Sequence, residues 1–261
     1  LRYVGVDETS FQKRHEYVTV VSNLEGSKVL YVGDDRKRES LDGFWTGLRP
    51  EQRHQIEAVA MDMWEPYIQS TREYLPDAAS KIVFDKFHVA MHLNKAVDLV
   101  RRQEHRELMG EGKTWLKGTK YDWLRHPDNF SLKATRRFNQ LRLKVNKVAR
   151  AWSMKETAMY LWDLHYPAVA ERHFRAWYRW ARRGHLEPMK KVALMLKRHW
   201  DNIKTFFKHR ITNAGAESVN EKIQTVKRRA RGFRNRERFR NAIFFHCGGL
   251  ELYPVAVHAG S

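Results

Sequence analysis

Two short runs of sequence, YVGVDE (residues 3–8) and AVAMDMW (residues 58–64), decide the predicted fold. Each is an apolar run that leads directly into an aspartate, Asp7 in the first and Asp62 in the second. Runs of this length that are rich in β-branched and small apolar residues predict buried strands. A carboxylate at the end of such a strand is costly to desolvate unless a cation or hydrogen-bond donors compensate for it. The alternative is that each aspartate only begins a turn.

The segments around these two strands predict an α/β fold. Strands are expected at 2–8, 16–21, 28–32, 56–61 and 81–87, and helices at 38–48 and 67–75. The first three strands follow one another across short polar segments, which favours an antiparallel meander. The predicted order is β-β-β-α-β-α-β, a mixed sheet with helices on its faces.

A long helical segment follows the fifth predicted strand. Seven of the nine tryptophans lie between residues 89 and 212, enough large side chains for a separate core, so we expect an all-helical insertion there. After it, Asn213 is expected to cap a late helix. The predicted domains are 1–88 as the first part of the core, 89–212 as the insertion, 213–245 as the late helix and basic segment that complete the core, and 246–261 as a C-terminal tail.

Composition excludes several classes of protein. The 261 residues carry 49 Lys+Arg against 30 Asp+Glu, a formal net charge of +19. With 13 Phe, 10 Tyr and 9 Trp the chain is too rich in core-forming residues for a disordered basic tail. The single cysteine, Cys247, excludes a disulfide framework and an iron–sulfur cluster. No uncharged apolar run reaches the ~18 residues of a membrane span, and the positive charge favours nucleic acid as a partner.

A third carboxylate is expected in the late helix. Its predicted polar face carries Glu217, Asn220, Glu221 and Gln224. Glu217 is a candidate metal-binding carboxylate, but taken by itself a glutamate at this position is more often an ordinary early-helix carboxylate that the helix dipole favours. Glu221, one turn further on, is a competing candidate.

Basic residues are concentrated directly after that helix. Eight of the 14 residues from 227 to 240 are basic. They are Lys227, Arg228, Arg229, Arg231, Arg234, Arg236, Arg238 and Arg240. A solvated basic face is the ordinary explanation of such a run, but its position beside candidate metal-binding carboxylates favours contact with DNA phosphates.

Four stretches together resemble the DDE-type bacterial insertion-sequence transposases, and most closely their ISL3 family. They are YVGVDETSF (3–11), AVAMDMWEPY (58–67), KIVFDKFHV (81–89) and TNAGAESVNEKIQTVKRRARGFRNRERFR (212–240). The resemblance implies an RNase H-like core with a large helical insertion before the last catalytic helix. It further implies that Asp7, Asp62 and Glu217 are catalytic and bind two Mg²⁺ or Mn²⁺ ions.

The same resemblance implies a function and partners. The chain would be a DNA transposase catalytic domain that cleaves and transfers strands at transposon ends, acting on double-stranded DNA of those ends and of the target. Two copies of the chain would form a homodimer when two transposon ends are brought together. The protein would act in the bacterial cytoplasm, at the nucleoid, and would not bind a membrane. Nothing here matches the family's N-terminal region for end recognition, so we expect a catalytic piece of a longer protein.

Several residues keep two interpretations. Asp85 and His88 match an Asp-x-x-His element that could orient a catalytic carboxylate or the scissile phosphate, or could be a structural pair. Asn220 and Glu221 are candidates for supporting the catalytic carboxylates. Trp177 and Trp180, interleaved with arginines, suit stacking on an unpaired base, but their i, i+3 spacing also fits a helix core.

Two other functions stay open. An RNase H-like nuclease or resolvase would cleave without strand transfer, using the same carboxylates. A catalytically silent, domesticated DNA-binding protein would not need to keep them.

Overall fold

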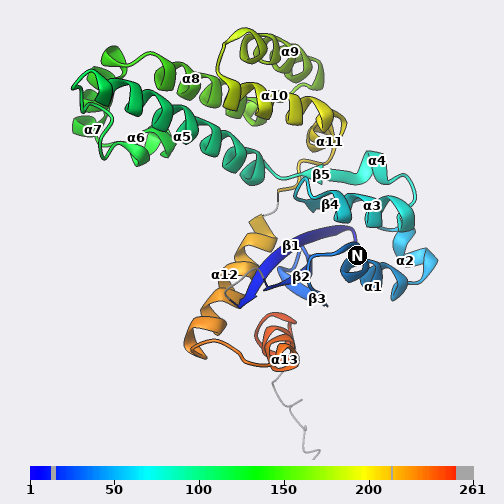
Figure 1. The fold of residues 1–261 in the computed structure, drawn as a ribbon. Helices are drawn as coiled ribbons and strands as arrows, with labels where there is room; N and C mark the ends of the chain where they lie inside the picture. The colour runs from blue at the N-terminus through cyan, green and yellow to red at the C-terminus, as the bar shows by residue number, and fades with distance from the viewer. Residues whose placement is uncertain (13–15, 213, 251–261) are drawn as a thin grey trace, which may run out of the picture. The chain divides into compact units, whose positions relative to one another are not determined.

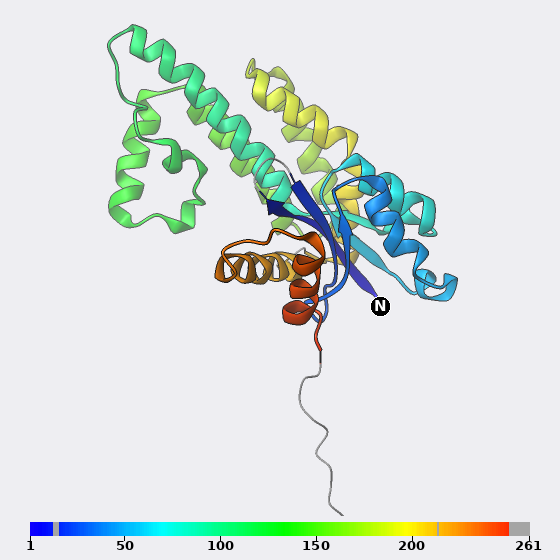
Figure 2. The same cartoon turned by 60° about the horizontal axis from the view of Figure 1, so that its bottom comes forward.

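The structure, a computed structural model, describes residues 1–12, 16–212 and 214–250. The expected cap Asn213 and most of the predicted tail therefore lie outside the described residues. The chain forms two compact units, Leu1–Val83 with Ile211–Ser261, and Phe84–Arg210. Figures 1 and 2 follow the chain from the sheet of the first unit into the helices of the second and back to α12 (Ala214–Arg229).

The first unit is built on a five-stranded mixed sheet. Its strands are β1 (Tyr3–Gln12), β2 (Glu16–Asn23), β3 (Lys28–Asp34), β4 (Ala58–Met61) and β5 (Ile82–Phe84), in the order β3-β2-β1-β4-β5. The pairs β1–β2 and β2–β3 are antiparallel, whereas β1 and β4 are parallel. A parallel pair needs a crossover connection, which here includes α1 (Arg38–Thr46) and α2 (Pro50–His54). The predicted mixed sheet with helices on its faces is confirmed, and its strand order is consistent with an RNase H-like core.

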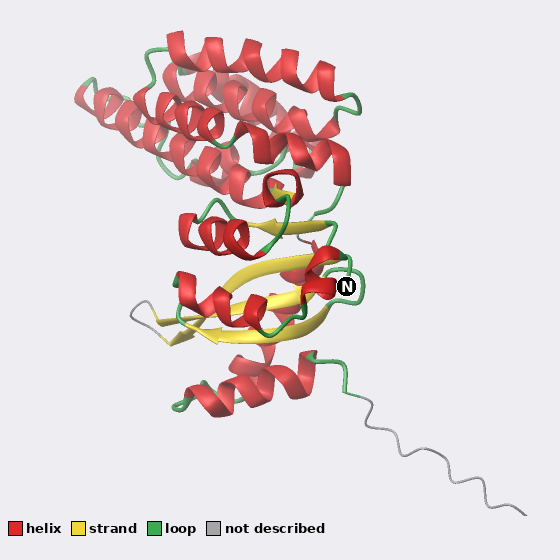
Figure 3. Ribbon diagram, turned by 90° about the vertical axis from the view of Figure 1, so that its right-hand side faces the viewer, coloured by secondary structure: helices red, strands yellow, loops and turns green. Residues whose placement is uncertain are grey.

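Helices cover both faces of this sheet (Figure 3). Val18 and Val20 of β2 share a buried cluster with residues of α12 and of α13 (Arg236–Cys247). Thr19, between them, bonds instead to Tyr67 of α3 (Glu65–Tyr74). Because successive strand residues point to opposite faces, α3 covers the face opposite α12 and α13.

The second unit is helical after the end of β5. It contains α5 (Lys86–Gly110), α6 (Lys120–Leu124), α7 (Leu132–Lys144), α8 (Lys147–Met159), α9 (Pro167–Arg183), α10 (Glu187–Arg198) and α11 (Trp200–His209), with short 3₁₀ turns at Pro127–Asn129 and Tyr160–Asp163. Its buried side chains include Trp123, Trp162, Trp177 and Trp200. The expectation of a helical insertion with its own aromatic core is confirmed.

Some predicted boundaries differ from the observed ones. The strand expected at 81–87 is shorter, because α4 (Ala78–Lys81) precedes it and α5 already begins at Lys86. Within the insertion, the helical periodicity of the sequence runs from residue 132 to 150 and predicts one helix, whereas the structure has a break there between α7 and α8. There the buried Glu104 carboxylate accepts hydrogen bonds from the backbone N–H groups of Asn146, Lys147 and Val148 at 2.6–3.0 Å, which satisfies the start of α8. A long-range cap of this kind leaves no local sequence signal.

The basic segment also contains a helix that the sequence pattern missed. Helix α13 begins at Arg236, and the side chain of Asn235 accepts a hydrogen bond from the Arg238 backbone N–H at its start. Phe239 and Ile243 of this helix are fully buried against the sheet. Across the described residues, no helix is long and apolar enough to cross a membrane.

Candidate functional site

Helix α12 packs along strand β1, and the spacing of its residues along the helix axis matches the spacing of residues along the strand. Four helix residues rise about 6 Å and two strand residues about 6.6 Å, so every fourth residue of the helix can meet every second residue of the strand. The matching pairs are Gly5 with Ala216, Asp7 with Asn220, and Thr9 with Gln224. One polar row of α12 is therefore aligned with the strand that carries Asp7.

Gly5 permits this close approach. A Cβ at this position would lie 3.1 Å from Cβ of Ala216, 3.0 Å from Oγ of Ser22 and 2.6 Å from Cδ2 of Leu24. Any larger residue would have to displace the helix or the β2 end of the sheet. The glycine in the YVGVDE run is thus a packing requirement two residues before Asp7.

Both oxygens of the Asp7 carboxylate are hydrogen-bonded. Asn220 donates from Nδ2 to Oδ2 at 2.6 Å, and the backbone N–H of Glu8 donates to Oδ1 at 2.7 Å. Hydrogen bonds to an ionised carboxylate are shorter and stronger than neutral ones. The amide oxygen of Asn220 is buried and has no hydrogen-bond partner among the described residues. Asn220, predicted to support a catalytic carboxylate, therefore contacts the carboxylate of Asp7 directly.

Asp62 follows the strand next to that of Asp7. The parallel pairs Tyr3–Ala58 and Gly5–Ala60 have an offset of 55 residues, which also separates Asp7 from Asp62. Continued by two residues, this register brings Asp62, just past the C-terminal end of β4, level with Asp7 within β1. The Asp62 carboxylate accepts a hydrogen bond from the Met63 backbone N–H at 2.6 Å.

The two candidate glutamates lie on the exposed part of α12. Glu217 is in the first turn and Glu221 is one turn further on, and both side chains are exposed, whereas Asn220 and Gln224 face β1. Among residues 1–12, 16–212 and 214–250, no group of three His, Cys, Asp or Glu side chains is arranged to hold a metal ion. Within the described part of the chain, α12 thus lies against the strand of Asp7, and the β1–β4 register brings Asp62 level with Asp7, but no three-residue metal group is formed.

A polar cluster on the opposite face of the sheet was not predicted. Tyr67 and Thr19 share a hydrogen bond of 2.8 Å between their hydroxyls, and Arg36 pairs with Glu8 at 3.2 Å. Burial raises the pKa of Tyr67 well above its usual range; the Thr19 bond opposes this, and the nearby charges of Glu8 and Asp7 add to it. The sequence signal was weak, a single tyrosine at the end of the AVAMDMWEPY stretch.

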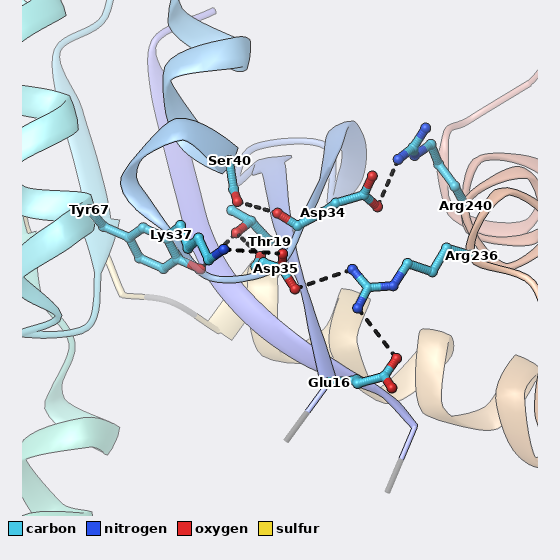
Figure 4. A network of polar contacts seen from close by, with 9 residues as sticks. All are labelled: Glu16, Thr19, Asp34, Asp35, Lys37, Ser40, Tyr67, Arg236 and Arg240. Atoms are coloured by element: carbon cyan, nitrogen blue, oxygen red, sulfur yellow. Dashed lines mark hydrogen bonds and ion pairs between the residues drawn. The ribbon is translucent and has the colours of Figure 1, made fainter. Parts of the chain in front are cut away.

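Three of the eight basic residues predicted to bind DNA bond to residues of the sheet and of the segment that follows β3. Arg236 pairs with Asp35 at 3.2 Å and with Glu16 at 3.3 Å, and Arg240 pairs with Asp34 at 2.9 Å (Figure 4). Lys227 donates to the backbone oxygen and to the hydroxyl of Ser10 at 2.7 and 2.9 Å, and burial lowers its pKa. These three cations hold α12 and α13 on the sheet.

The other five basic residues of that segment are exposed. They are Arg228, Arg229, Arg231, Arg234 and Arg238. Arg231 and Gly232 have positive φ angles of 54° and 93° and form the turn that separates α12 from α13. The exposed arginines therefore lie at the end of α12, in the turn and at the start of α13.

The remaining predicted residues belong to the second unit. Asp85 is 5% exposed and takes the N-cap position of α5, with His88 in the first turn of that helix. Trp177 is 2% exposed and donates from Nε1 to the Met154 carbonyl at 2.8 Å, which corresponds to the core interpretation and corrects the stacking one. Trp180 is 38% exposed. It keeps the surface that stacking would need.

Comparison with known proteins places the chain among transposases. A family model described as a transposase, of the ISL3 group of DDE transposases, matches residues 4–243. The chain is 29% identical over 242 residues to the transposase for insertion sequence element IS1001 of Bordetella parapertussis, with 92% of this chain and 59% of that protein covered. It is 24% identical over 258 residues to the transposase for IS1557 of Mycobacterium tuberculosis, with 90% and 57% covered. The chain thus spans less than two thirds of the length of these curated relatives.

Proposed function

The chain belongs to the ISL3 family of DDE transposases, and from that premise we propose that it cleaves DNA strands at the ends of an insertion sequence and joins them to target DNA. The hydrogen bond from Asn220 to Asp7 carries the proposal, because it aligns the helix bearing Glu217 with the strand bearing Asp7. The parallel register of β1 and β4, which continued by two residues brings Asp62 level with Asp7, supports it further.

The donor chemistry of these residues fits Mg²⁺ or Mn²⁺. Asp7, Asp62 and Glu217 offer only carboxylate oxygens, the ligands that hard cations prefer, and the buried Asn220 amide oxygen lacks a hydrogen-bond partner within the described part of the chain. We propose that the three carboxylates hold two such ions. When bound, the ions would supply Lewis acidity to the scissile phosphate and charge stabilisation for the attacking and leaving oxygens.

The chain's own residues would orient the reacting groups. Asn220 and the Glu8 backbone N–H fix both oxygens of Asp7, so that this carboxylate is already oriented before DNA binds. In cleavage, a water oxygen forms the new bond to phosphorus while the bond to the 3′ oxygen breaks. In transfer, the freed 3′ hydroxyl attacks a phosphorus of the target strand and a second phosphodiester bond breaks. No covalent enzyme intermediate is needed.

The exposed arginines between α12 and α13 would hold the DNA. Arg228, Arg229, Arg231, Arg234 and Arg238 can donate two parallel hydrogen bonds each to phosphate oxygens. Such contacts position DNA without reading its sequence. We propose that double-stranded DNA of the element ends and of the target is bound here, at the bacterial nucleoid, and that two copies of the chain act together when two ends are joined.

The experiment combines a labelled, uncleaved element end, a supercoiled target plasmid and Mn²⁺. Products in which the label is joined to the plasmid support strand transfer, whereas nicking without joining would replace it with the nuclease function. DNA binding with neither reaction, in a chain that folds normally, would indicate the silent DNA-binding protein.

Glu217→Gln and Glu221→Gln form a matched pair for the catalytic glutamate. Both side chains are exposed on α12, one turn apart, and each substitution removes one charge. We expect Glu217→Gln to abolish cleavage with DNA affinity almost unchanged, and Glu221→Gln to retain cleavage. The reverse result would transfer the role to Glu221.

A further inference from the structure

A basic groove lies between α9 and α10 of the second unit. Its volume is about 660 Å³, and its lining includes Arg172, Arg175, Arg179, Lys197, Glu171 and Tyr178. Four cations and one carboxylate give this groove a net charge of +3. All of these residues lie within the helical unit.

The three arginines form one row. Their spacing of i, i+3 and i+7 places Arg172, Arg175 and Arg179 on a single face of α9, along about 10 Å of its axis. All three side chains are exposed. Lys197 reaches the same groove from α10, so that the row is flanked by a fourth cation.

The floor of the groove is aromatic. Phe174 is 4% exposed and stacks on Trp200 with ring centroids 3.9 Å apart and an interplanar angle of 6°. Tyr178 stacks against Phe174 at 6.2 Å. The aromatic rings are therefore part of the core beneath the arginines, and the charged groups form the accessible surface.

Most of this charge is not neutralised within the chain. Arg175 pairs with Glu171 at 2.6 Å. Within the described ranges, Arg172, Arg179 and Lys197 make no ion pair. A row of guanidinium groups that is only partly compensated favours a ligand with regularly spaced anionic oxygens, and the phosphodiester backbone has that chemistry.

We propose that this α9–α10 groove binds the backbone of duplex DNA, as a contact surface separate from the arginines that follow α12. The proposal rests on the proposed function, because it takes DNA as the substrate. It assigns the helical insertion a direct part in holding that substrate. The contact is electrostatic and independent of sequence.

The test compares the full chain with the variant Arg172→Gln, Arg175→Gln, Arg179→Gln. Binding of a fluorescein-labelled duplex of arbitrary sequence is measured by anisotropy in EDTA, at several salt concentrations. Loss of three phosphate contacts should reduce the slope of log K against log salt by about 2.7, so the affinity ratio of parent to variant should grow about 40-fold from 200 to 50 mM salt. An unchanged slope would overturn the proposal.

A matched control separates the groove from bulk charge. Lys117, Lys133 and Arg136 are exposed cations of the same unit that do not line the groove. Their triple substitution by Gln removes the same charge and should change the slope much less. If both triple variants lose the same slope, the effect comes from net charge and the groove has no specific part.

A second pair of variants removes a negative charge instead of positive ones, so that DNA binding is expected to become tighter. Glu171 pairs with Arg175 inside the groove, and Glu187 pairs with Lys190 at 2.6 Å outside it. Glu171→Gln should tighten DNA binding severalfold by releasing Arg175, while Glu187→Gln should have a smaller effect. Equal effects of the two substitutions would contradict the proposal.

The two proposals can fail separately. If the triple arginine variant binds DNA like the parent and the parent joins DNA strands, only the groove is disproved. If the parent depends on the groove for binding but cleaves nothing with Mn²⁺, the proposed reaction is disproved and the groove stands.

Discussion

Asn220 and Asp7, 213 residues apart in the chain, share a hydrogen bond of 2.6 Å from the amide Nδ2 to the carboxylate Oδ2. This bond fixes α12 against β1 at the level of the candidate catalytic aspartate. Glu217 lies on the same helix, three residues before Asn220. The position of one candidate ligand relative to another thus depends on how this helix packs.

Asn220→Ala should lower the rate of strand cleavage about 10- to 100-fold, the range found when a residue that orients a metal ligand is removed. It should also raise the Mn²⁺ concentration needed for half-maximal activity, because Asp7 loses its orientation. Gln224→Ala is the control, since Gln224 makes an equivalent 2.6 Å bond to Thr9 on the same helix. Both variants should lose about 1 kcal/mol of unfolding free energy, and only the first should change the metal dependence.

Gly5→Val should displace α12 from β1, because its Cβ would start 3.1 Å from Cβ of Ala216 before the two methyl groups are added. Overpacking of this kind costs about 1–3 kcal/mol, and cleavage should fall with it. Gly110→Ala is the matched control, as nothing lies within 4 Å of a Cβ there. Urea unfolding and a cleavage assay of both variants check the prediction; an unaffected Gly5→Val would contradict the packing described.

Arg236→Gln and Arg234→Gln should separate structural from DNA-binding arginines. Arg236 pairs with Asp35 and Glu16, both partly exposed, so its loss should cost no more than about 1 kcal/mol of stability and little DNA affinity. Arg234 is exposed, so its loss should weaken DNA binding and leave the melting temperature unchanged. Thermal unfolding and anisotropy measure both quantities. Equal losses of affinity would contradict the division.

Tyr67 should make the fold sensitive to alkaline pH. Its pKa is raised in the folded chain, chiefly by burial, while the unfolded chain releases the proton near pH 10. Above about pH 10 the unfolding free energy should therefore fall by up to about 1.4 kcal/mol per pH unit from this group. Tyr67→Phe should remove that part of the slope in denaturant titrations, whereas Tyr121→Phe, at a side chain 70% exposed, should keep it.

Local patterns were sufficient for the elements that begin the site. The apolar runs before Asp7 and Asp62 predicted two buried strands, and both are observed, although β1 continues past Asp7 to Gln12 while β4 ends at Met61, just before Asp62. The position of α12 also followed from its apolar stripe, whose Val219 and Ile223 are fully buried. The alternation of apolar and polar residues in a strand, and their 3.6-residue periodicity in a helix, indicate which side chains are buried. The burial of those side chains stabilises these elements.

The local sequence did not indicate which residues each charged side chain would contact. Eight basic residues in 14 looked equivalent, yet Lys227, Arg236 and Arg240 bind strand residues while five arginines are exposed. The break between α7 and α8 is likewise set by Glu104, about 40 residues away in the chain. Such contacts form between groups that only the folded chain brings together.

The sequence by itself determined the sheet, the helical insertion and the family, because the spacing of hydrophobic residues and the order of the motifs are properties of the chain before it folds. Only the tertiary structure decided that Asn220 donates a hydrogen bond to Asp7, and that a row of arginines on α9 lines a groove. The reason is geometric. A helix face is fixed by its sequence, but the strand or helix that it meets is fixed by packing over long chain separations.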